Sequence, residues 1–383
     1  MPPPLVAPYI ETLAPYIPGK PIEEVTREYG VLDPVKLASN ENPLGPSPLA
    51  IAAVQAALDK LNLYPDGSAF ALKHGLSKFL GVPVSNLVLG NGTNELITLL
   101  ARTFLADGDE AVFSAGTFVA YRIAVQSSGR AFTEVPMRAN AADLVGMLAA
   151  VTARTRLLFL ANPDNPNGTY VRGEALEAFL SQLPERCLVV LDEAYFEFAQ
   201  GAPGYPNGLE LRQRFPNLVV LRTFSKIYGL AGLRVGFGVS SPEVVTYLDR
   251  VRDAFNVNTL GQVGALAALG DVAHVQQTLA VTAEGRDLFV RELPRFGFTV
   301  VPSAANFVLV DTHRSGRQLF ESLLPLGCIV RPAAAYGMPN AVRISVGTPR
   351  DNQRLLDALA HVAKFAPAAN SKPDPERHEP ARS

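Results

Sequence analysis

Short apolar runs alternate with amphipathic helical stretches along most of the chain. The runs lie at residues 86–89, 111–113, 157–160, 188–191, 218–221 and 233–239. Uninterrupted apolar runs are typical of strands buried on both faces, as in a parallel sheet covered by helices. The pattern therefore predicts an α/β fold with a mostly parallel central sheet and helices on both faces.

The N-terminal part of the chain has a different pattern. The first forty residues are rich in proline and irregular, which is typical of an extended arm. A helix is predicted from Pro48, because Ile51, Val54, Leu58 and Leu61 then fall on one face.

The pattern changes again beyond about residue 262. A helical stretch at 276–293 precedes alternating segments at 298–301 and 306–310, and a strand-like piece at 341–346 leads into a closing helix. This order predicts a smaller α+β domain. We expect an arm with part of the small domain at 1–45, a large domain at 46–262, the small C-terminal domain at 263–365 and a disordered tail at 366–383.

Composition narrows the class of protein. The 383 residues are 48% hydrophobic and carry a net charge of −2 without a basic block, which argues against nucleic acid as a partner. No apolar run approaches the ~18 residues of a membrane span, and the start of the chain lacks the pattern of a secretory signal. Two cysteines without metal-ligand spacing favour a reducing compartment, so we expect a cytoplasmic enzyme.

Unusual residues follow several of the predicted strands. Ligands of open α/β sheets bind beyond the carboxyl ends of the strands. The sequence GNGTNE at 90–95 opens a predicted helix, where free backbone N–H groups suit a phosphate. Glu95 replaces the third glycine of a dinucleotide fingerprint, and the chain has no nucleoside-triphosphate loop.

Three further strand ends carry candidate chemistry. Asn165 lies in NPDNPNG, Asp192 begins DEAY, and Lys226 follows TFS. A lysine at such a strand end can lose its proton and form a Schiff base, and the guanidinium of Arg234 in an apolar stretch favours an anion. Taken singly, these residues could be a turn, a helix cap and a surface lysine. Together they predict one site at one edge of the sheet.

Seven segments, in order, resemble the pyridoxal-phosphate-dependent aminotransferases of fold type I, and more narrowly their histidinol-phosphate aminotransferase branch. The resemblance extends from about residue 9 to residue 349. The segments are LASNENPLGP at 37–46, YPD at 64–66, GNGTNE at 90–95, NPDNPNG at 162–168, DEAY at 192–195, residues 223–234 and VRISVGT at 342–348.

The resemblance implies roles around a pyridoxal 5'-phosphate cofactor. Lys226 would carry the cofactor and then move a proton during the reaction, and Asp192 would face the pyridine nitrogen. Tyr195 and Asn165 would hydrogen-bond the phenolic oxygen of the ring. Phe118 would stack on the ring, where the family more often has Tyr or Trp, although Phe118 could instead belong to the core.

The resemblance also implies how the cofactor phosphate is held. The turn would supply backbone groups, the strand ends would supply side chains, and a homodimer would supply Tyr64 from the neighbouring subunit. The residues of this chain are Gly92, Thr93 and Asn94 in the turn and Thr223, Ser225 and Arg234 at the strand ends.

The substrate side follows from the same resemblance. Arg343 matches the arginine that grips the anionic group of the substrate, and Arg331 matches a second one. Tyr16 and Asn42 match positions that close over the substrate. Arg343 could instead be a strand-surface charge, and Tyr16 could anchor the arm.

The resulting prediction is a transaminase that converts L-histidinol phosphate and 2-oxoglutarate into imidazole-acetol phosphate and L-glutamate. The alternatives are an aromatic amino-acid transaminase and a pyridoxal-phosphate-dependent decarboxylase of phospho-amino acids. A metal site is not expected, because the five histidines are scattered without an H-E-x-x-H motif. Two departures from the family pattern, Asn167 for Thr and Ala254 for Pro, concern specificity rather than mechanism.

Overall fold

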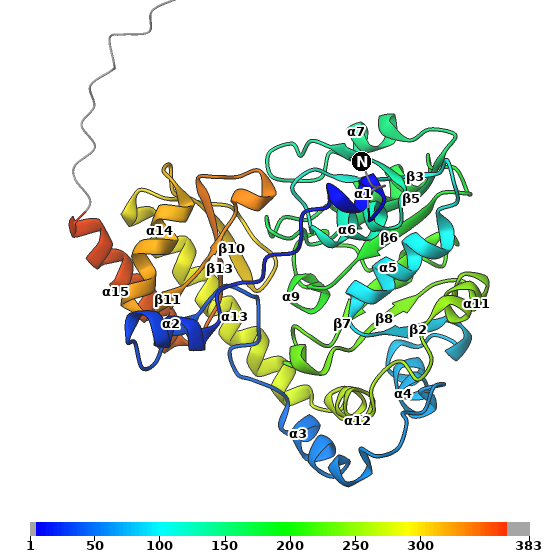
Figure 1. Ribbon diagram of the computed structural model, residues 1–383, viewed down its shortest axis with the longest axis horizontal. Coiled ribbons are helices and arrows are strands. Elements are labelled where there is room, and N and C mark those ends of the chain that lie inside the picture. Colours follow the sequence, from blue (N-terminus) through cyan, green and yellow to red (C-terminus); the bar gives the residue numbers. More distant parts are fainter. Residues whose placement is uncertain (1–4, 366–383) are drawn as a thin grey trace, which may run out of the picture.

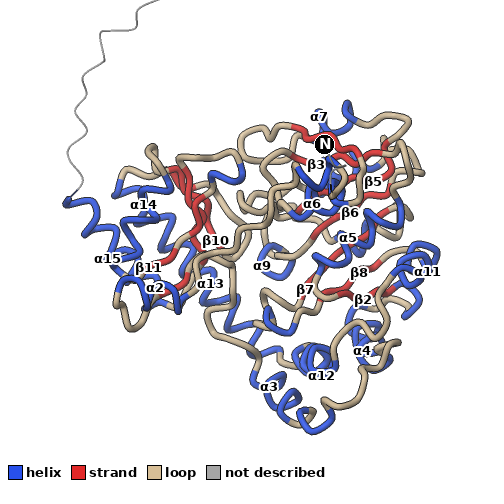
Figure 2. The backbone as a smooth tube through the Cα atoms, in the orientation of Figure 1, coloured by secondary structure: helices blue, strands red, loops and turns tan. Residues whose placement is uncertain are grey.

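The computed structural model describes residues 5–365 and has one large and two smaller sheets (Figure 1, Figure 2). The large sheet has seven strands in the order β2-β8-β7-β6-β5-β3-β4. Its strands are β2 (Leu87–Gly90), β3 (Glu110–Ser114), β4 (Ala131–Val135), β5 (Thr155–Ala161), β6 (Leu188–Asp192), β7 (Leu218–Thr223) and β8 (Gly236–Val239). Only β8 runs antiparallel to its neighbours, so the predicted mostly parallel sheet is confirmed.

Some of the helices pack on both faces of this sheet, and others lie beside the two smaller sheets. They are α1 (Pro8–Glu11), α2 (Ile22–Tyr29), α3 (Pro48–Gln55), α4 (Phe70–Leu80), α5 (Thr93–Phe104), α6 (Ala120–Ser127), α7 (Leu144–Ala150), α8 (Gly173–Leu180), α9 (Phe196–Ala199), α10 (Gly208–Leu211), α11 (Pro242–Val251), α12 (Thr259–Ala268), α13 (Val272–Glu292), α14 (Gly316–Leu323) and α15 (Pro349–Phe365). Alternate residues of β6 explain the two layers: Val190 packs with α5, α6 and α11, whereas Val189 and Leu191 pack with α4, α7, α8 and α12. Both faces of the strand are buried, which is why its sequence is continuously apolar.

Two elements differ from the sequence-based expectation. Strand β4 (AFTEV) lies at the sheet edge with two of its residues exposed and two only partly buried, so it lacks the continuous apolar run that identified the other strands. Strand β8 begins at Gly236 instead of residue 233, because residues 231–233 form a 3-10 turn and Arg234 adopts a left-handed φ of 57°.

The remaining strands form two smaller sheets. A four-stranded antiparallel sheet has the order β12-β13-β10-β9, and a two-stranded parallel sheet pairs β1 with β11. The strands are β1 (Val35–Lys36), β9 (Thr299–Val300), β10 (Phe307–Asp311), β11 (Cys328–Ile329), β12 (Arg331–Pro332) and β13 (Ala341–Ser345). Val35 and Leu37 join the same hydrophobic core as Phe289, Val308 and Leu355, so an N-terminal segment completes the C-terminal unit.

The N-terminal arm connects the two parts of the molecule. Helix α1 contacts α6 beside the large sheet, and the chain then crosses to α2 and β1 beside β11 (Figure 1). The helix from Pro48 is α3, which ends at Gln55, and Leu58 and Leu61 beyond it are exposed rather than buried. The tail expected at 366–383 lies outside the described residues. Between residues 5 and 365, no helix has the length and apolar character needed to span a bilayer.

Candidate active site

A cavity of about 270 Å³ opens at the carboxyl ends of β5, β6 and β7, beside the N-terminus of α5. Most of the residues predicted from the strand ends line it together. They are Gly92, Thr93, Asn94, Phe118, Asn165, Asp192, Tyr195, Thr223, Ser225, Lys226 and Arg234.

Lys226 enters the cavity from the loop that follows β7. Its Nζ lies 3.4 Å from the carbonyl oxygen of Ser39 and 5.7 Å from the centroid of the Tyr195 ring. Burial, together with the positive charges of Arg343 and Arg234, lowers the pKa of the Lys226 ammonium to about 8. The amine therefore loses its proton near neutral pH, as a nucleophile that attacks a carbonyl must.

Asp192 ends β6 at the base of the cavity. The Tyr121 hydroxyl donates a 2.9 Å hydrogen bond to its Oδ2, and the backbone N–H of Ala194 donates one of 3.2 Å to its Oδ1. Within the described part of the chain the carboxylate forms no ion pair. Burial raises its pKa to about 6, so a cation brought to this carboxylate would be strongly stabilised.

Tyr195 follows Asp192 and is fixed by the N-terminal segment. The Asn40 side-chain amide donates a 3.0 Å hydrogen bond to the Tyr195 hydroxyl. Asn40 is buried and is itself held by Ser345, whose hydroxyl donates to Asn40 Oδ1 at 2.8 Å. Because its oxygen accepts the hydrogen bond from Asn40, the Tyr195 hydroxyl remains free to donate a hydrogen bond into the cavity.

The turn before α5 is shaped by the absence of side chains. Gly92 has a φ of 73°, and a Cβ there would meet Arg234 Nη2 at 2.7 Å. A Cβ on Gly236 would meet the backbone nitrogen of Thr93 at 2.4 Å. These glycines leave the first N–H groups of α5 and the Arg234 guanidinium side by side, which is a site for a phosphate.

Arg343 on β13 reaches the same region from the small sheet. Its Nη1 donates to Asn165 Oδ1 at 2.5 Å, and its Nη2 donates to the carbonyl oxygen of Ala38 at 2.6 Å. The guanidinium lies 5.3 Å from the Phe307 ring centroid and is buried, with an Nε that has no partner among the described residues. The buried donor suits an anionic group that enters beside Asn165.

Three other predicted residues lie away from the cavity lining. The Arg331 guanidinium lies 5.9 Å from the ring centroid of Tyr16, which is exposed, and donates to the carbonyl oxygen of Ile17 at 2.7 Å. Asn42 donates to the carbonyl oxygen of Ile227 at 2.8 Å and to Thr278 Oγ1 at 3.1 Å. The amide of Asn42 is therefore used to hold the 37–46 segment against α13.

Tyr64 is also outside this cavity. Its side chain is 80% exposed, and its ring stacks on Phe255 with centroids 4.4 Å apart. A large aromatic side chain with this exposure is typical of a surface that another chain covers.

The Asn167 departure has a visible structural basis. Its side-chain amide donates to Asp164 Oδ2 at 2.6 Å, and Thr117 Oγ1 donates to Asp164 Oδ1 at 2.5 Å. Burial raises the pKa of the Asp164 carboxyl to about 6. The side-chain amide of Asn167 thus stabilises the turn that carries Asn165 through its hydrogen bond to Asp164.

Four residues that shape the site were not predicted from the sequence. Tyr121, Ser39 and Glu41 line the cavity, and Asn40 holds Tyr195. Tyr121 could have been found from its spacing, since it lies one helical turn after Phe118. The other three belong to the SNEN motif, in which only Asn42 was singled out.

Comparisons with known proteins agree with this geometry. Residues 33–359 match the family model of aminotransferase class I and II. The chain is 53% identical over 361 residues to a histidinol-phosphate aminotransferase of Anaeromyxobacter sp. (strain Fw109-5), covering 94% of this chain and 99% of the relative. It is 49% identical over 354 residues to one of Moorella thermoacetica, covering 92% of both chains.

Solved structures show the same fold. A histidinol-phosphate aminotransferase from Sinorhizobium meliloti, in complex with pyridoxal-5'-phosphate, superimposes with a TM-score of 0.87 at 31% identity and covers 94% of this chain and 98% of its own. An aspartate aminotransferase from Thermus thermophilus, complexed with maleate, shares the fold alone, with a TM-score of 0.80 at 22% identity over 94% of this chain and 99% of its own.

Proposed function

Because the chain belongs to the class I and II aminotransferases, we propose that it transfers the amino group of L-histidinol phosphate to 2-oxoglutarate, forming imidazole-acetol phosphate and L-glutamate in histidine biosynthesis. The observation that carries the proposal is one cavity that joins Lys226, the buried Asp192 and the Gly92 turn. Identities of 49% and 53% to histidinol-phosphate aminotransferases over most of the chain support the substrate.

Pyridoxal 5'-phosphate is the cofactor. The chemistry of the cavity fits it, because an amine of lowered pKa suits its aldehyde, a buried carboxylate suits its ring nitrogen and the Gly92 turn suits its phosphate. When bound, pyridoxal phosphate supplies an electron sink for charge that develops on the substrate carbon. Thr93, Asn94, Thr223, Ser225 and Arg234 would hold the phosphate, and Phe118 would cover the ring.

The side chains of this protein do the remaining work. The neutral amine of Lys226 takes a proton from the amino-bearing carbon of the donor. In the second half-reaction Lys226 delivers a proton to the carbon of 2-oxoglutarate that receives the amino group. The Asp192 carboxylate would face the ring nitrogen, and its negative charge would favour the protonated nitrogen that keeps the ring electron-poor. Tyr195 and Asn165 donate hydrogen bonds into the cavity and fix the orientation of the bound ring.

The substrate would be held beside the cavity, on the side where β12 and β13 approach Asn165. Arg343 and Arg331 are cross-strand neighbours there and offer two guanidinium groups to an anion, and Tyr16 packs against Arg331. Both substrates are anionic, so one arginine pair can serve both half-reactions. We propose that Asn42 contributes by holding its segment in place, in line with its bonds to Ile227 and Thr278.

The active unit would be a homodimer in which Tyr64 reaches the neighbouring cavity. Exposed apolar side chains close to Tyr64 support this assembly. They are Leu58, Leu61, Leu63 and Phe255.

We also propose a division into an arm and small-domain part at 1–45, a large domain from residue 46 and a small domain that ends at 365. The boundary expected at 262 falls within α12, whose Ala265 and Ala268 pack in the core of the large sheet. The division therefore belongs at the junction of α12 and α13.

The free, buried Cys187 and Cys328 support a cytoplasmic location.

A single-turnover assay tests the proposed substrate. Enzyme loaded with cofactor is mixed with histidinol phosphate, phenylalanine or phosphothreonine, and the loss of the visible absorption of the lysine-bound cofactor is followed. We expect histidinol phosphate to react fastest. A faster reaction with phenylalanine would indicate an aromatic transaminase, and carbon dioxide release from phosphothreonine would indicate a decarboxylase.

A further inference from the structure

We propose that Arg252 is a positioning residue for Tyr64, and that through Tyr64 it acts on the active site of the partner subunit more than on its own. The inference rests on the proposed homodimer in which Tyr64 crosses to the neighbouring cavity. It adds a residue that no predicted role includes, and it makes the loop after α11 part of the partner's site.

Tyr64 has little support from its own surroundings. Its ring is 80% exposed and stacks nearly parallel on Phe255, at an angle of 16° and a centroid distance of 4.4 Å. Phe255 is itself about half exposed and has a left-handed φ of 59°. The direction of Tyr64 therefore depends on what fixes the loop that carries Phe255 and the turn that follows Tyr64.

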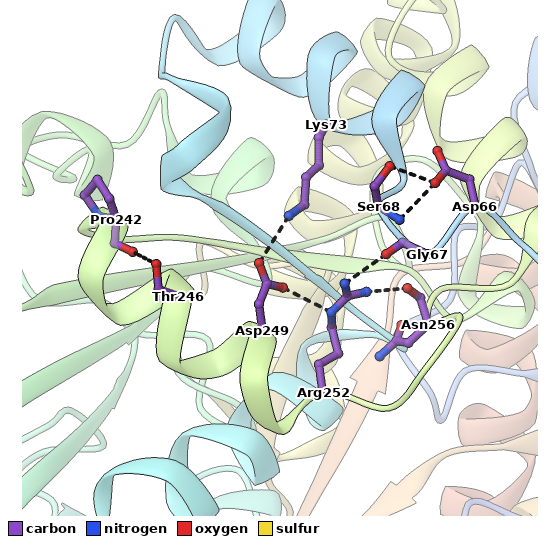
Figure 3. Close-up of polar contacts among 9 residues, drawn as sticks. All are labelled: Asp66, Gly67, Ser68, Lys73, Pro242, Thr246, Asp249, Arg252 and Asn256. Atoms are coloured by element: carbon purple, nitrogen blue, oxygen red, sulfur yellow. Dashed lines mark hydrogen bonds and ion pairs between the residues drawn. The ribbon is translucent and has the colours of Figure 1, made fainter.

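Arg252 joins these two segments (Figure 3). Its Nη2 donates to the carbonyl oxygen of Gly67 at 2.9 Å, three residues after Tyr64, and its Nη1 donates to the carbonyl oxygen of Asn256, next to Phe255. Its Nε donates to Asp249 Oδ1 at 3.1 Å, which orients the guanidinium from α11. Only 13% of the side chain is exposed, so these contacts form largely out of solvent.

The planar guanidinium is needed for this arrangement. It presents separate donors to two carbonyl groups and one carboxylate, whereas a lysine ammonium is a point charge on a flexible stem. Lys73 does not take its place, because its Nζ pairs with Asp249 Oδ2 at 3.7 Å and hydrogen-bonds to neither carbonyl group (Figure 3).

The turn after Tyr64 keeps its own fold without Arg252. Asp66 accepts hydrogen bonds from the backbone N–H groups of Ser68 and Phe70, at 2.9 and 2.8 Å, and thereby caps α4. Gln262 on α12 donates to the carbonyl oxygen of Asp66 at 2.9 Å. Removing the Arg252 side chain should therefore release the turn from the Phe255 loop without unfolding α4.

The same loop also approaches its own cavity. The Asn256 side chain donates to Glu95 on α5, and Glu95 Oε2 accepts a 2.5 Å hydrogen bond from the backbone N–H of Asn91. Because Arg252 contacts only the backbone of Asn256, its effect on its own site should be the smaller one. The test must separate the two sites.

Hybrid dimers make this separation. Two differently tagged chains are co-expressed and purified on both tags, and one chain always carries Lys226→Ala, so each dimer has one site with a lysine-bound cofactor. In the first hybrid Arg252→Ala lies on the Lys226→Ala chain, and in the second it lies on the chain that retains Lys226. The readout is the dissociation constant of pyridoxal phosphate at the Lys226 site, from its visible absorption, together with turnover.

The two hybrids contain the same substitutions and differ only in their placement, so each controls for the folding of the other. We expect the first hybrid to bind the cofactor about tenfold more weakly than a hybrid without Arg252→Ala, the order of one lost hydrogen bond to a charged group, and the second to change far less. Arg252→Lys in the first hybrid should show nearly the same loss. A lysine keeps the positive charge but lacks the separate planar donors that bond to the two carbonyl groups. An equal loss in both hybrids, or none in the first, would overturn the role of Arg252.

A third hybrid tests the underlying dimer. Tyr64→Phe on the Lys226→Ala chain must weaken cofactor binding at the intact site. If it does not, the shared site is wrong and the inference falls with it. If it does while Arg252→Ala has no effect, only the role of Arg252 is wrong.

Discussion

Lys226 has its reactivity set by the charges around it. Burial, Arg343 and Arg234 all lower the pKa of its ammonium, to about 8. A positive charge near an ammonium disfavours its protonated form. Arg343 therefore has an effect on the amine in addition to its proposed contact with substrate.

Replacing Arg343 with Gln should raise the pKa of Lys226, because one of the two positive charges is lost. The neutral amine is the reactive form, so the rate at which the cofactor-free enzyme binds pyridoxal phosphate should rise with pH. The midpoint of this rise, the inflection, should lie at a higher pH in the variant than in the unmodified protein. Stopped-flow absorbance over a pH series measures the inflection. Arg331→Gln, which removes an arginine that is not among the causes of the shift, should leave it in place; an unmoved inflection in Arg343→Gln would contradict the assignment.

Asp192 depends on Tyr121 in a similar way. The hydroxyl of Tyr121 stabilises the carboxylate and lowers its pKa, against the larger opposite effect of burial. Tyr121→Phe should raise that pKa above about 6, so the ionised form would be lost at a higher pH than in the unmodified protein.

The expected result is weaker cofactor binding on the acid side of neutrality, with a difference that narrows as the pH rises. Equilibrium titrations of the cofactor at several pH values would measure it. Tyr170→Phe is a suitable control, because the Tyr170 hydroxyl donates at 2.9 Å to the carbonyl oxygen of Pro203. A uniform loss at every pH would indicate a packing defect instead.

At the scale of elements, the ends of β6 and β7 are tied by a buried ion pair. Arg222 Nε donates to Glu193 Oε2 at 2.9 Å, and the side chains are 6% and 0% exposed. Glu193 Oε1 also accepts the backbone N–H of Gly208 at 2.8 Å. The pair fixes the strand end next to Asp192.

Arg222→Met should lower the free energy of unfolding by about 3–5 kcal/mol, because it leaves Glu193 buried without its partner. Urea denaturation followed by circular dichroism measures the change. The exposed pair of Arg317 and Glu321 provides the comparison, and Arg317→Met should cost less than about 1 kcal/mol. Equal effects of the two substitutions would show that the buried pair is not a special support of the sheet.

Whether an element can be predicted from the sequence depends on how completely it is buried. Strands such as β6 are buried on both faces, so their position and the chemistry at their carboxyl ends could be predicted from local sequence. The edge strand β4 and the left-handed Arg234 could not, because their conformations depend on neighbouring segments. The same limit applies to Asn40 and Glu41, whose place at the site results from contacts between distant parts of the chain.

At the scale of the whole molecule, the described chain leaves an apolar surface uncovered. The sequence predicts one apolar helix face from Pro48 to Leu61, yet Ile51, Leu58 and Leu61 are exposed in the structure. Leu61 is 57% exposed, and the exposed Leu63 and Tyr64 follow it in the chain. Contiguous apolar side chains on a surface are typical of protein interfaces. A second copy of the chain that covers this face would bury the exposed apolar side chains and would also bring Tyr64 to the neighbouring cavity.

Leu61→Glu places a charge in that face, and the desolvation cost of burying it should prevent assembly. We expect the variant to sediment as a monomer near 41.0 kDa, whereas the unmodified protein should sediment at about twice this mass. Its turnover should fall with assembly, because Tyr64 would no longer reach a neighbouring cavity. Leu32→Glu is the matched control, since Leu32 is 93% exposed beside Asp33 and its substitution should change neither mass nor turnover. A Leu61→Glu monomer with full activity would show that each cavity is complete within one chain, and the proposed role of Tyr64 would then be wrong.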